Sequence, residues 1–178
     1  MESLAYSALD SPVGPLTIAI SDRGLAVLAF GRELPAKLGG QSVQWRESVP
    51  ATADVRRQLK EYFAGERRDF DLALDLRGTE FQRDCWEALL GIPYGETRSY
   101  GEIARTVGRP NAYRAVGQSN HHNPVAIIVP CHRVLASGTE LGGYGGGLPT
   151  KAFLLKLEGA KFRDNESSFQ AQTALSFR

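Results

Sequence analysis

The residues Pro130, Cys131 and His132 offer the clearest chemistry in this sequence. One of the two cysteines follows a proline and precedes an imidazole, directly after the apolar run 125–129. Cysteine attacks as the thiolate, and a neighbouring histidine can raise the thiolate fraction. Since an ordinary thiol has a pKa of about 8.5, it needs such an activating group at neutral pH. Cys131 is therefore a candidate nucleophile, and a proline at the start of a helical turn would place it near the positive end of that turn.

Two other interpretations of these residues stay open at this point. A buried structural cysteine beside a surface histidine would look the same in the sequence. Zinc ligands usually lie two to four residues apart, whereas Cys131 and His132 are adjacent, so the spacing argues against a metal site. The second cysteine, Cys85, shares a helix face with Phe81 and Leu89 and is expected to pack as a small buried hydrophobe.

Length and composition indicate an ordinary globular protein. The chain has 178 residues, of which 42% are hydrophobic and 23% charged. Two cysteines argue against a disulfide framework and suit a reducing compartment. The N-terminus lacks the pattern of a signal peptide, and no apolar run is long enough to span a membrane. We expect a soluble, cytoplasmic protein with one domain or two small ones.

The charges are unevenly distributed, although the net charge is only +1. Between residues 98 and 133 five arginines face a single acid, Glu102, and all three histidines lie in the same stretch. A solvated basic face and a phosphate-binding surface both fit this pattern. Arg114 stands among small residues, so a helix carrying it can approach a partner closely.

The first part of the chain predicts strands and one helix. Apolar alternation over 16–20 and 25–29, around a turn at 22–24, predicts a hairpin. Residues 34–50 are rich in Pro, Gly and Ser and are predicted to form a loop. Helical spacing predicts a helix over 52–63, and alternation over 70–74 predicts another strand.

The second part predicts mainly helices. Capping-box patterns at Thr79–Gln82 and Ser99–Glu102 begin two of them. The helix from Ser99 ends before Gly108, and a second short helix follows over 112–119, so the pair resembles a helix-turn-helix. Residues 125–129 are predicted to be buried and extended. A glycine-dense loop spans 141–147 and precedes a last helix over 150–157, and Lys161–Arg178 is predicted to be a mobile tail.

Several motifs together resemble the methylated-DNA–protein-cysteine S-methyltransferase family, the O6-alkylguanine-DNA alkyltransferases, in their bacterial form. The matching segments occur in the family's order and spacing from about 79 to 160, with weaker matches at 11–14 and 62–65. They are Ile92–Tyr100, Arg114–Gly117, Asn123–Pro124, Pro130–Val134, Gly143–Tyr144 and the helix from Lys151 to Glu158.

The resemblance implies a role for each matching residue. Cys131 would accept the alkyl group, and His132 would act as a base through a water molecule, with Glu158 holding the imidazole. The implied catalytic set is Cys131, His132, Glu158, Asn123 and Tyr100. The implied substrate-binding set is Val134, Tyr144, Gly145 and Gly146. The implied DNA-binding set is Arg114, Tyr113, Ala115, Gly117, Ser119 and Asn120, with Arg114 filling the gap left by a flipped nucleotide.

The resemblance also implies the fold, the domains and the partners. We expect an α/β (α+β) protein: an RNase H-like unit over 1–77, a mainly helical catalytic and DNA-binding unit with a winged-helix-like helix-turn-helix over 78–160, and a flexible tail over 161–178. The partner would be double-stranded DNA bearing O6-alkylguanine, repaired once per molecule without a cofactor or metal. A monomer is expected in solution. A non-catalytic sensor of damaged DNA and a cysteine hydrolase are the alternatives.

Overall fold

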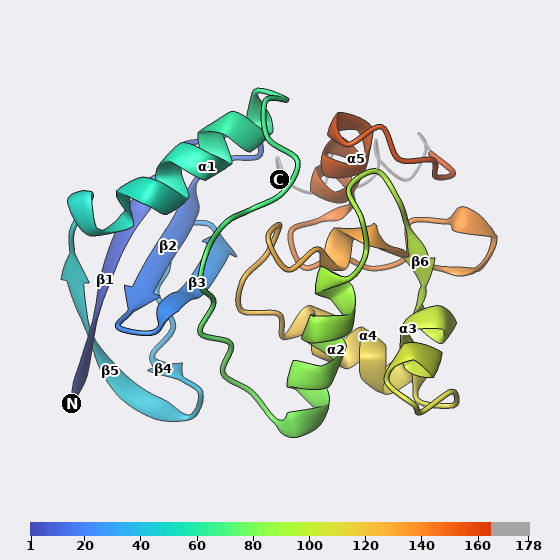
Figure 1. Ribbon diagram of the computed structural model, residues 1–178, viewed down its shortest axis with the longest axis horizontal. Coiled ribbons are helices and arrows are strands. Elements are labelled where there is room, and N and C mark those ends of the chain that lie inside the picture. The colour runs from blue at the N-terminus through green and yellow to red at the C-terminus, as the bar shows by residue number, and fades with distance from the viewer. Residues whose placement is uncertain (165–178) are drawn as a thin grey trace, which may run out of the picture. The chain divides into compact units, whose positions relative to one another are not determined.

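The structure is a computed structural model that describes residues 1–164. Its fold is mixed α/β, as the sequence predicts, and it divides into two units (Figure 1). The first comprises Met1–Arg83 and Pro124–Ile128, and the second comprises Asp84–Asn123 and the described chain from Val129. No helix within these described residues is long and apolar enough to cross a membrane.

A five-stranded sheet forms the first unit. The hairpin predicted over 16–29 is confirmed, because β2 (Leu16–Ser21) and β3 (Gly24–Phe30) pair antiparallel. The loop predicted over 34–50 is wrong, because this segment contains two strands, one of which pairs parallel with β1. In sheet order the strands are β3 (Gly24–Phe30), β2 (Leu16–Ser21), β1 (Glu2–Leu9), β5 (Gln41–Glu47) and β4 (Lys37–Leu38).

The helix α1 (Ala53–Phe63) covers one face of this sheet (Figure 1). The predicted helical spacing is confirmed, since Val55, Leu59 and Tyr62 are buried. A hydroxyl pair, Ser7 with Thr52 at 2.6 Å, joins β1 to the turn that begins the helix. Burial of these apolar side chains supplies most of the stabilisation of this layer.

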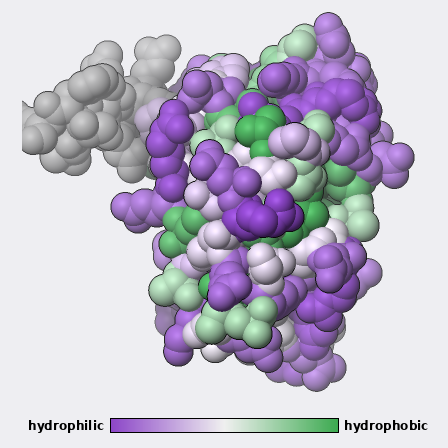
Figure 2. Space-filling view, turned by 90° about the vertical axis from the view of Figure 1, so that its left-hand side faces the viewer, coloured by the Kyte–Doolittle hydropathy of each residue, from purple (hydrophilic) through white to green (hydrophobic). Residues whose placement is uncertain are grey.

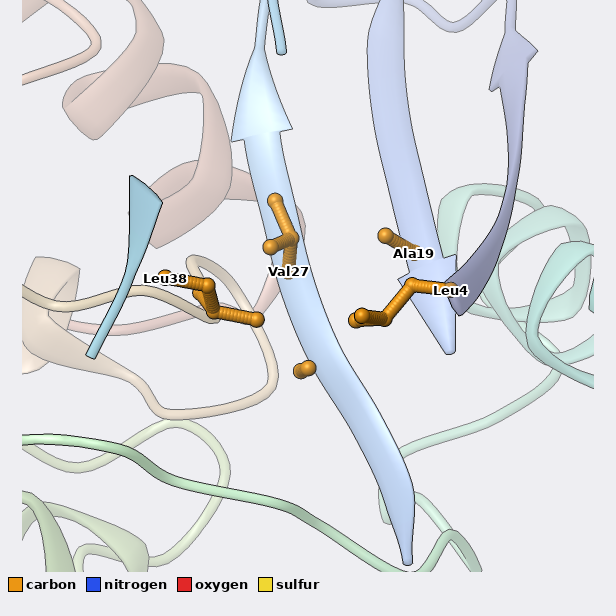
Figure 3. Close-up of a cluster of buried hydrophobic side chains, with 5 residues drawn as sticks. Leu4, Ala19, Val27 and Leu38 are labelled. Carbon is orange, nitrogen blue, oxygen red and sulfur yellow. The ribbon is translucent and has the colours of Figure 1, made fainter. Parts of the chain in front are cut away.

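A second apolar cluster lies on the sheet, where Leu4, Ala19 and Val27 meet Leu38 (Figure 3). Tyr6 packs edge-on against Trp45 beside it, with ring centroids 6.4 Å apart. On the face that Figure 2 presents, hydrophobic patches are separated by hydrophilic side chains. Scattered apolar residues of this kind are normal on a soluble surface.

The strand predicted over 70–74 is wrong. Only Leu74 forms a bridge, with Leu25, through the bonds that the Leu25 N–H donates to the Ala73 carbonyl and that the Asp75 N–H donates to the Leu25 carbonyl. The alternating apolar residues of this segment therefore contact the start of β3 at one position and do not form a ladder of inter-strand hydrogen bonds.

Helices dominate the second unit. Both predicted capping boxes are present, at Thr79 with Gln82 and at Ser99 with Glu102. Cys85 is fully buried, as expected. The described elements are α2 (Glu80–Leu90), β6 (Arg98–Ser99), α3 (Tyr100–Thr106), α4 (Tyr113–His121), β7 (Val134–Leu135) and α5 (Leu148–Leu157), with β6 and β7 paired in parallel. The predicted tail falls mostly on 165–178, outside the described residues.

The segment 125–129 is buried, but it is not extended. Val125 bridges to Leu28, and the Ile128 N–H then bonds back to the Ala126 carbonyl at 2.7 Å. The residue between them, Ile127, has φ of 70°, which is rare for a β-branched side chain. This tight turn changes the direction of the chain just before Pro130. The apolar composition of the segment does not indicate it.

Gly24→Ala should destabilise the first unit by about 3 kcal/mol or more. Its φ of 142° suits glycine, and an added Cβ would lie 2.4 Å from the Ala73 carbonyl oxygen. Gly14→Ala is the matched control, because its φ of 91° is also positive but nothing lies within 4 Å of an added Cβ. Urea unfolding of both variants measures the difference, and equal losses would contradict the close contact.

Candidate active site

Cys131 stands at the end of a tight backbone turn. Pro130 has φ −84° and ψ 65°, and the Cys131 N–H donates to the Val129 carbonyl at 2.8 Å, which is the geometry of an inverse γ-turn. A 3-10 turn, Cys131–Arg133, follows. Pro130 therefore lies just before the helical turn, not inside it as predicted. The proline ring holds the backbone that presents the thiol.

The side chain of Asn123 ties this turn together. Its Nδ2 donates to the Val129 carbonyl at 2.8 Å and to the Cys131 Sγ at 3.3 Å. The amide thus spans the γ-turn and contacts the sulfur itself. A donor aimed at the sulfur favours the thiolate over the thiol.

Burial opposes ionisation of this thiol. Cys131 is only 8% exposed, and burial raises the pKa of its thiol, while the Asn123 hydrogen bond and the positive charge of Lys151 lower it. The net pKa is above the ordinary value. The resting form is therefore the thiol, and a base must take its proton during reaction.

The imidazole of His132 lies in a buried polar network. Its Nε2 is 2.8 Å from Glu158 Oε1, and both side chains are fully buried. Arg133 forms a fork on the same carboxylate, with Nε and Nη2 each donating at 2.9 Å, and its Nη1 donates to the Ile92 carbonyl at 2.7 Å. Burial alone would raise the pKa of Glu158, but the bonds from His132 and Arg133 outweigh it and lower that pKa to about 2.

These contacts determine the tautomer of His132. Burial lowers the pKa of the imidazole, although Glu158 partly opposes this shift, so the ring is neutral near pH 7. An ionised carboxylate only accepts, so Nε2 carries the proton and donates it to Glu158. The other nitrogen, Nδ1, is then an acceptor, and it is buried without a hydrogen-bond partner among the described residues. A basic nitrogen is therefore available on the residue that follows the nucleophile.

A cavity of about 410 Å³ opens beside Cys131. Tyr100 and Tyr144 lie in its wall, and burial raises the pKa of both phenols, so each stays a neutral donor. Of the predicted substrate-binding glycines, Gly145 lines the cavity and Gly146 is not among the lining residues. The full lining is Tyr100, Gly117, Gln118, Asn120, His121, Cys131, Gly143, Tyr144 and Gly145.

The predicted DNA-binding residues of α4 separate into two groups. Tyr113, Arg114 and Ala115 are exposed, and the Arg114 guanidinium lies 5.9 Å from the centre of the Tyr113 ring. Ser119 is buried and its carbonyl accepts from the Trp86 indole at 2.8 Å, so its side chain does not reach the surface.

Gly117 and Asn120 belong to the cavity wall. Gly117 faces the Tyr100 ring, which an added Cβ would meet at 3.8 Å. Among the predicted DNA-binding residues of α4, the exposed ones are thus its first three.

Two charged residues of this site, Arg133 and Lys151, were not predicted to be functional from the sequence. Arg133 is buried against Glu158, and Lys151 is fully buried on α5, where its Nζ bonds to backbone carbonyls. Arginine and lysine are normally exposed, so composition carries no signal for either. Among residues 1–164 no group of three or more His, Cys, Asp or Glu could hold a metal ion.

Comparison with known proteins agrees with this geometry. Residues 80–160 match the family model of the 6-O-methylguanine DNA methyltransferase, DNA binding domain, and residues 4–76 match that of its ribonuclease-like domain. The methylated-DNA–protein-cysteine methyltransferase of Mycolicibacterium paratuberculosis is 52% identical over 157 residues, which cover 87% of this chain and 92% of the relative. The protein of the same name from Mycobacterium tuberculosis is 53% identical over 153 residues, covering 86% and 91%.

A solved structure shows the same fold. The crystal structure of Mycobacterium tuberculosis OGT in complex with DNA has a TM-score of 0.80 and 48% identity, covering 93% of this chain and 99% of that one. These matches confirm the resemblance inferred from the motifs around Cys131 and the predicted RNase H-like fold of the first unit. The chain therefore belongs to the 6-O-methylguanine DNA methyltransferase family, and the relatives named above are methylated-DNA–protein-cysteine methyltransferases.

Proposed function

We propose that this protein repairs DNA by moving the alkyl group of O6-alkylguanine, and of O4-alkylthymine, onto its own Cys131. The observation that carries the proposal is the sulfur itself, which lines a cavity and belongs to the residue before the neutral imidazole of His132, whose Nδ1 has no hydrogen-bond partner among the described residues. Family membership supports the same reaction, because the named relatives transfer a methyl group from DNA to a protein cysteine.

The reaction needs one bond to form and one to break. The Cys131 thiolate attacks the alkyl carbon, the carbon–O6 bond breaks, and its electron pair stays on the purine. The thiol proton passes to His132 Nδ1 through a water molecule, and Glu158 stabilises the imidazolium that results. The product is a thioether, which no group in the site can cleave. Each molecule therefore acts once.

Other cavity residues receive the substrate. Tyr100 donates to the ring nitrogen of the departing guanine, and the Gly145 N–H binds O6. The carbonyls of Cys131 and Val134 accept from the exocyclic amine. Tyr144 completes the wall around the base, and Gly146 belongs to the same glycine-rich segment outside the lining. These roles follow from the family motif together with the position of Tyr100 and Gly145 in the cavity wall.

The damaged nucleotide must leave the duplex to reach the buried sulfur. Extrusion costs a few kcal/mol, and an inserted side chain offsets part of that cost. Arg114, on the exposed start of α4, fills the gap, with Tyr113 and Ala115 beside it in the minor groove. The helices α3 and α4 act as the helix-turn-helix, and Gly117, Ser119 and Asn120 contribute through backbone or cavity contacts.

The proposal extends to the organisation of the protein. The proposed domains are one over 1–77 and a catalytic and DNA-binding one over 78–160, and the protein works as a monomer that can cluster on DNA. The chemistry requires neither cofactor nor metal, since the nucleophile, the base and the acceptor all belong to the chain. A free thiol and access to chromosomal DNA suit the cytoplasm.

Cys131→Ser should retain DNA binding and lose alkyl transfer, because a hydroxyl is far less nucleophilic than a thiolate. Intact-mass measurement after mixing with methylated duplex should show one added methyl on the wild type and none on the variant. Peptide mapping should place it on Cys131. Cys85→Ser is the control and should still be methylated. An unmodified, DNA-binding wild type would instead favour a damage sensor, and repeated turnover would favour a hydrolase.

Arg114→Ala should slow repair of duplex DNA roughly 30-fold, which corresponds to about 2 kcal/mol of the extrusion cost. The rate with free O6-benzylguanine should change little, since a free base needs no extrusion. Single-turnover kinetics with both substrates measure the two rates. Arg105→Ala, on the exposed surface of α3, is the control. Equal slowing with duplex and free base would contradict the role of Arg114.

Transfer should fall in acid as His132 takes up a proton. Burial lowers the pKa of this histidine, so activity should persist below pH 6.5 and decline only at lower pH, where Nδ1 no longer accepts. His132→Gln should remove this acid limb and reduce the rate about 100-fold or more. Rates measured from pH 4.5 to 8 test this, and a wild-type midpoint above 6.5 would contradict it.

A further inference from the structure

Lys151 has an environment that the proposed reaction does not use. The side chain lies on α5 and is fully buried. Its Nζ donates to the carbonyls of Val134 at 2.6 Å, Leu141 and Gly143 at 3.2 Å. An ammonium has three N–H donors, and three acceptors surround this one. The contacts therefore match the protonated form.

These three carbonyls come from two separate segments of the site. Val134 begins β7, directly after the turn that carries Cys131. Leu141 and Gly143 begin the glycine-rich segment whose next residues, Tyr144 and Gly145, line the cavity. This segment has no helix or strand of its own between 141 and 147. The hydrogen bonds of the ammonium thus connect this glycine-rich segment, which lacks regular secondary structure, to β7, the strand that follows the nucleophile.

The charge of Lys151 also acts on the sulfur. The positive charge favours the Cys131 thiolate and lowers the pKa of that thiol, while burial raises it. The same charge adds to the burial that lowers the pKa of His132. The two tyrosines of the cavity wall stay neutral, because burial raises the pKa of each. Cys131 and His132 are therefore the titrating groups that respond to Lys151.

We infer that Lys151 is a positioning residue for alkyl transfer, which holds the glycine-rich cavity wall on β7 and supports the Cys131 thiolate by its charge. The inference rests on the proposed function for its biological meaning, but both of its physical parts can be measured without DNA. In this proposal the wall position orients the Gly145 N–H toward the purine oxygen, and the charge raises the fraction of reactive thiolate against the effect of burial.

Lys151→Met tests both parts, since methionine has similar length without charge or donors. Alkylation of Cys131 by iodoacetamide, followed by peptide mass spectrometry, should be roughly tenfold slower at pH 7, which corresponds to a pKa shift of about one unit. Burial lowers the pKa of Lys151 to about 8, so the wild type loses the charge itself at higher pH. The difference between the two proteins should therefore shrink above pH 8. Hydrogen exchange of the backbone amides in 141–147 should become faster in the variant.

Two further variants separate the contributions. Lys151→Gln keeps amide donors without charge, so it should show the slower alkylation and a smaller gain in hydrogen exchange. Lys156→Met, on the exposed surface of the same helix, should match the wild type in both measurements. A pH-independent loss in Lys151→Met would indicate a purely structural role and would overturn the electrostatic part. Unchanged exchange in 141–147 would overturn the positioning part.

The outcome stays decisive if the variants do not fold. The wild-type profile of iodoacetamide alkylation should then bend near pH 8, where Lys151 deprotonates, and a single titration without that bend would overturn the electrostatic part of the inference. Because the pKa of Lys151 is lowered in the folded chain from 10.5 to about 8, the contribution of this group to stability rises with pH between those values, whereas the raised pKa of Cys131 acts in the opposite direction. Failure of the wild type to take a methyl group from DNA would instead overturn the proposed function.

Discussion

The buried carboxylate of Glu158 is the interaction on which the active site depends. It accepts from the imidazole of His132 and from two nitrogens of Arg133, at 2.8 to 2.9 Å. An isolated buried carboxylate would be very costly, whereas one that is paired with a guanidinium and fully hydrogen-bonded is tolerated. The charge is therefore balanced by Arg133, which allows His132 to remain neutral. A neutral imidazole with a defined tautomer is what a base in this position requires.

The nucleophile illustrates a conflict between protection and reactivity. Burial keeps the Cys131 thiol protonated and shields it from unwanted electrophiles, but it also disfavours the thiolate that reacts. Three features work in the opposite direction: the donor from Asn123, the charge of Lys151 and the basic nitrogen of His132. The Asn123 amide contacts the sulfur, the Lys151 charge acts on it electrostatically, and His132 is the next residue in the chain. The site can therefore hold an inert thiol until a substrate occupies the cavity.

The backbone contributes as much as the side chains. Pro130 and Asn123 shape the γ-turn that presents Cys131, and Gly117 leaves space for the Tyr100 ring. Gly142 also lies close to Tyr100, since an added Cβ would be 3.4 Å from the Tyr100 hydroxyl. Small residues at these places bring two segments close to one aromatic ring. This closeness gives the cavity its shape and positions the phenol.

Local patterns in the sequence were sufficient for the hairpin of β2 and β3, for α1, and for the two capping boxes, because each depends on residues within a few positions of one another. The motif around Cys131 was likewise sufficient to identify the family. The strand β5 escaped prediction because it is ordered by parallel pairing with β1, about forty residues earlier, and only Val43 and Trp45 mark it in the sequence. The same limit applied to the buried turn at Ile127, whose apolar neighbours resemble a strand.

The sequence by itself determined which groups are present: a thiol after a proline, an adjacent imidazole, and a glutamate at the end of the last helix. Only the tertiary structure decided their chemical states. It placed Arg133 and His132 on one carboxylate, it buried the imidazole, which keeps the ring neutral, and it enclosed the Lys151 ammonium among three carbonyls. The protonation state of a side chain depends on its burial and on partners that are distant in the chain. Local sequence patterns show neither of these.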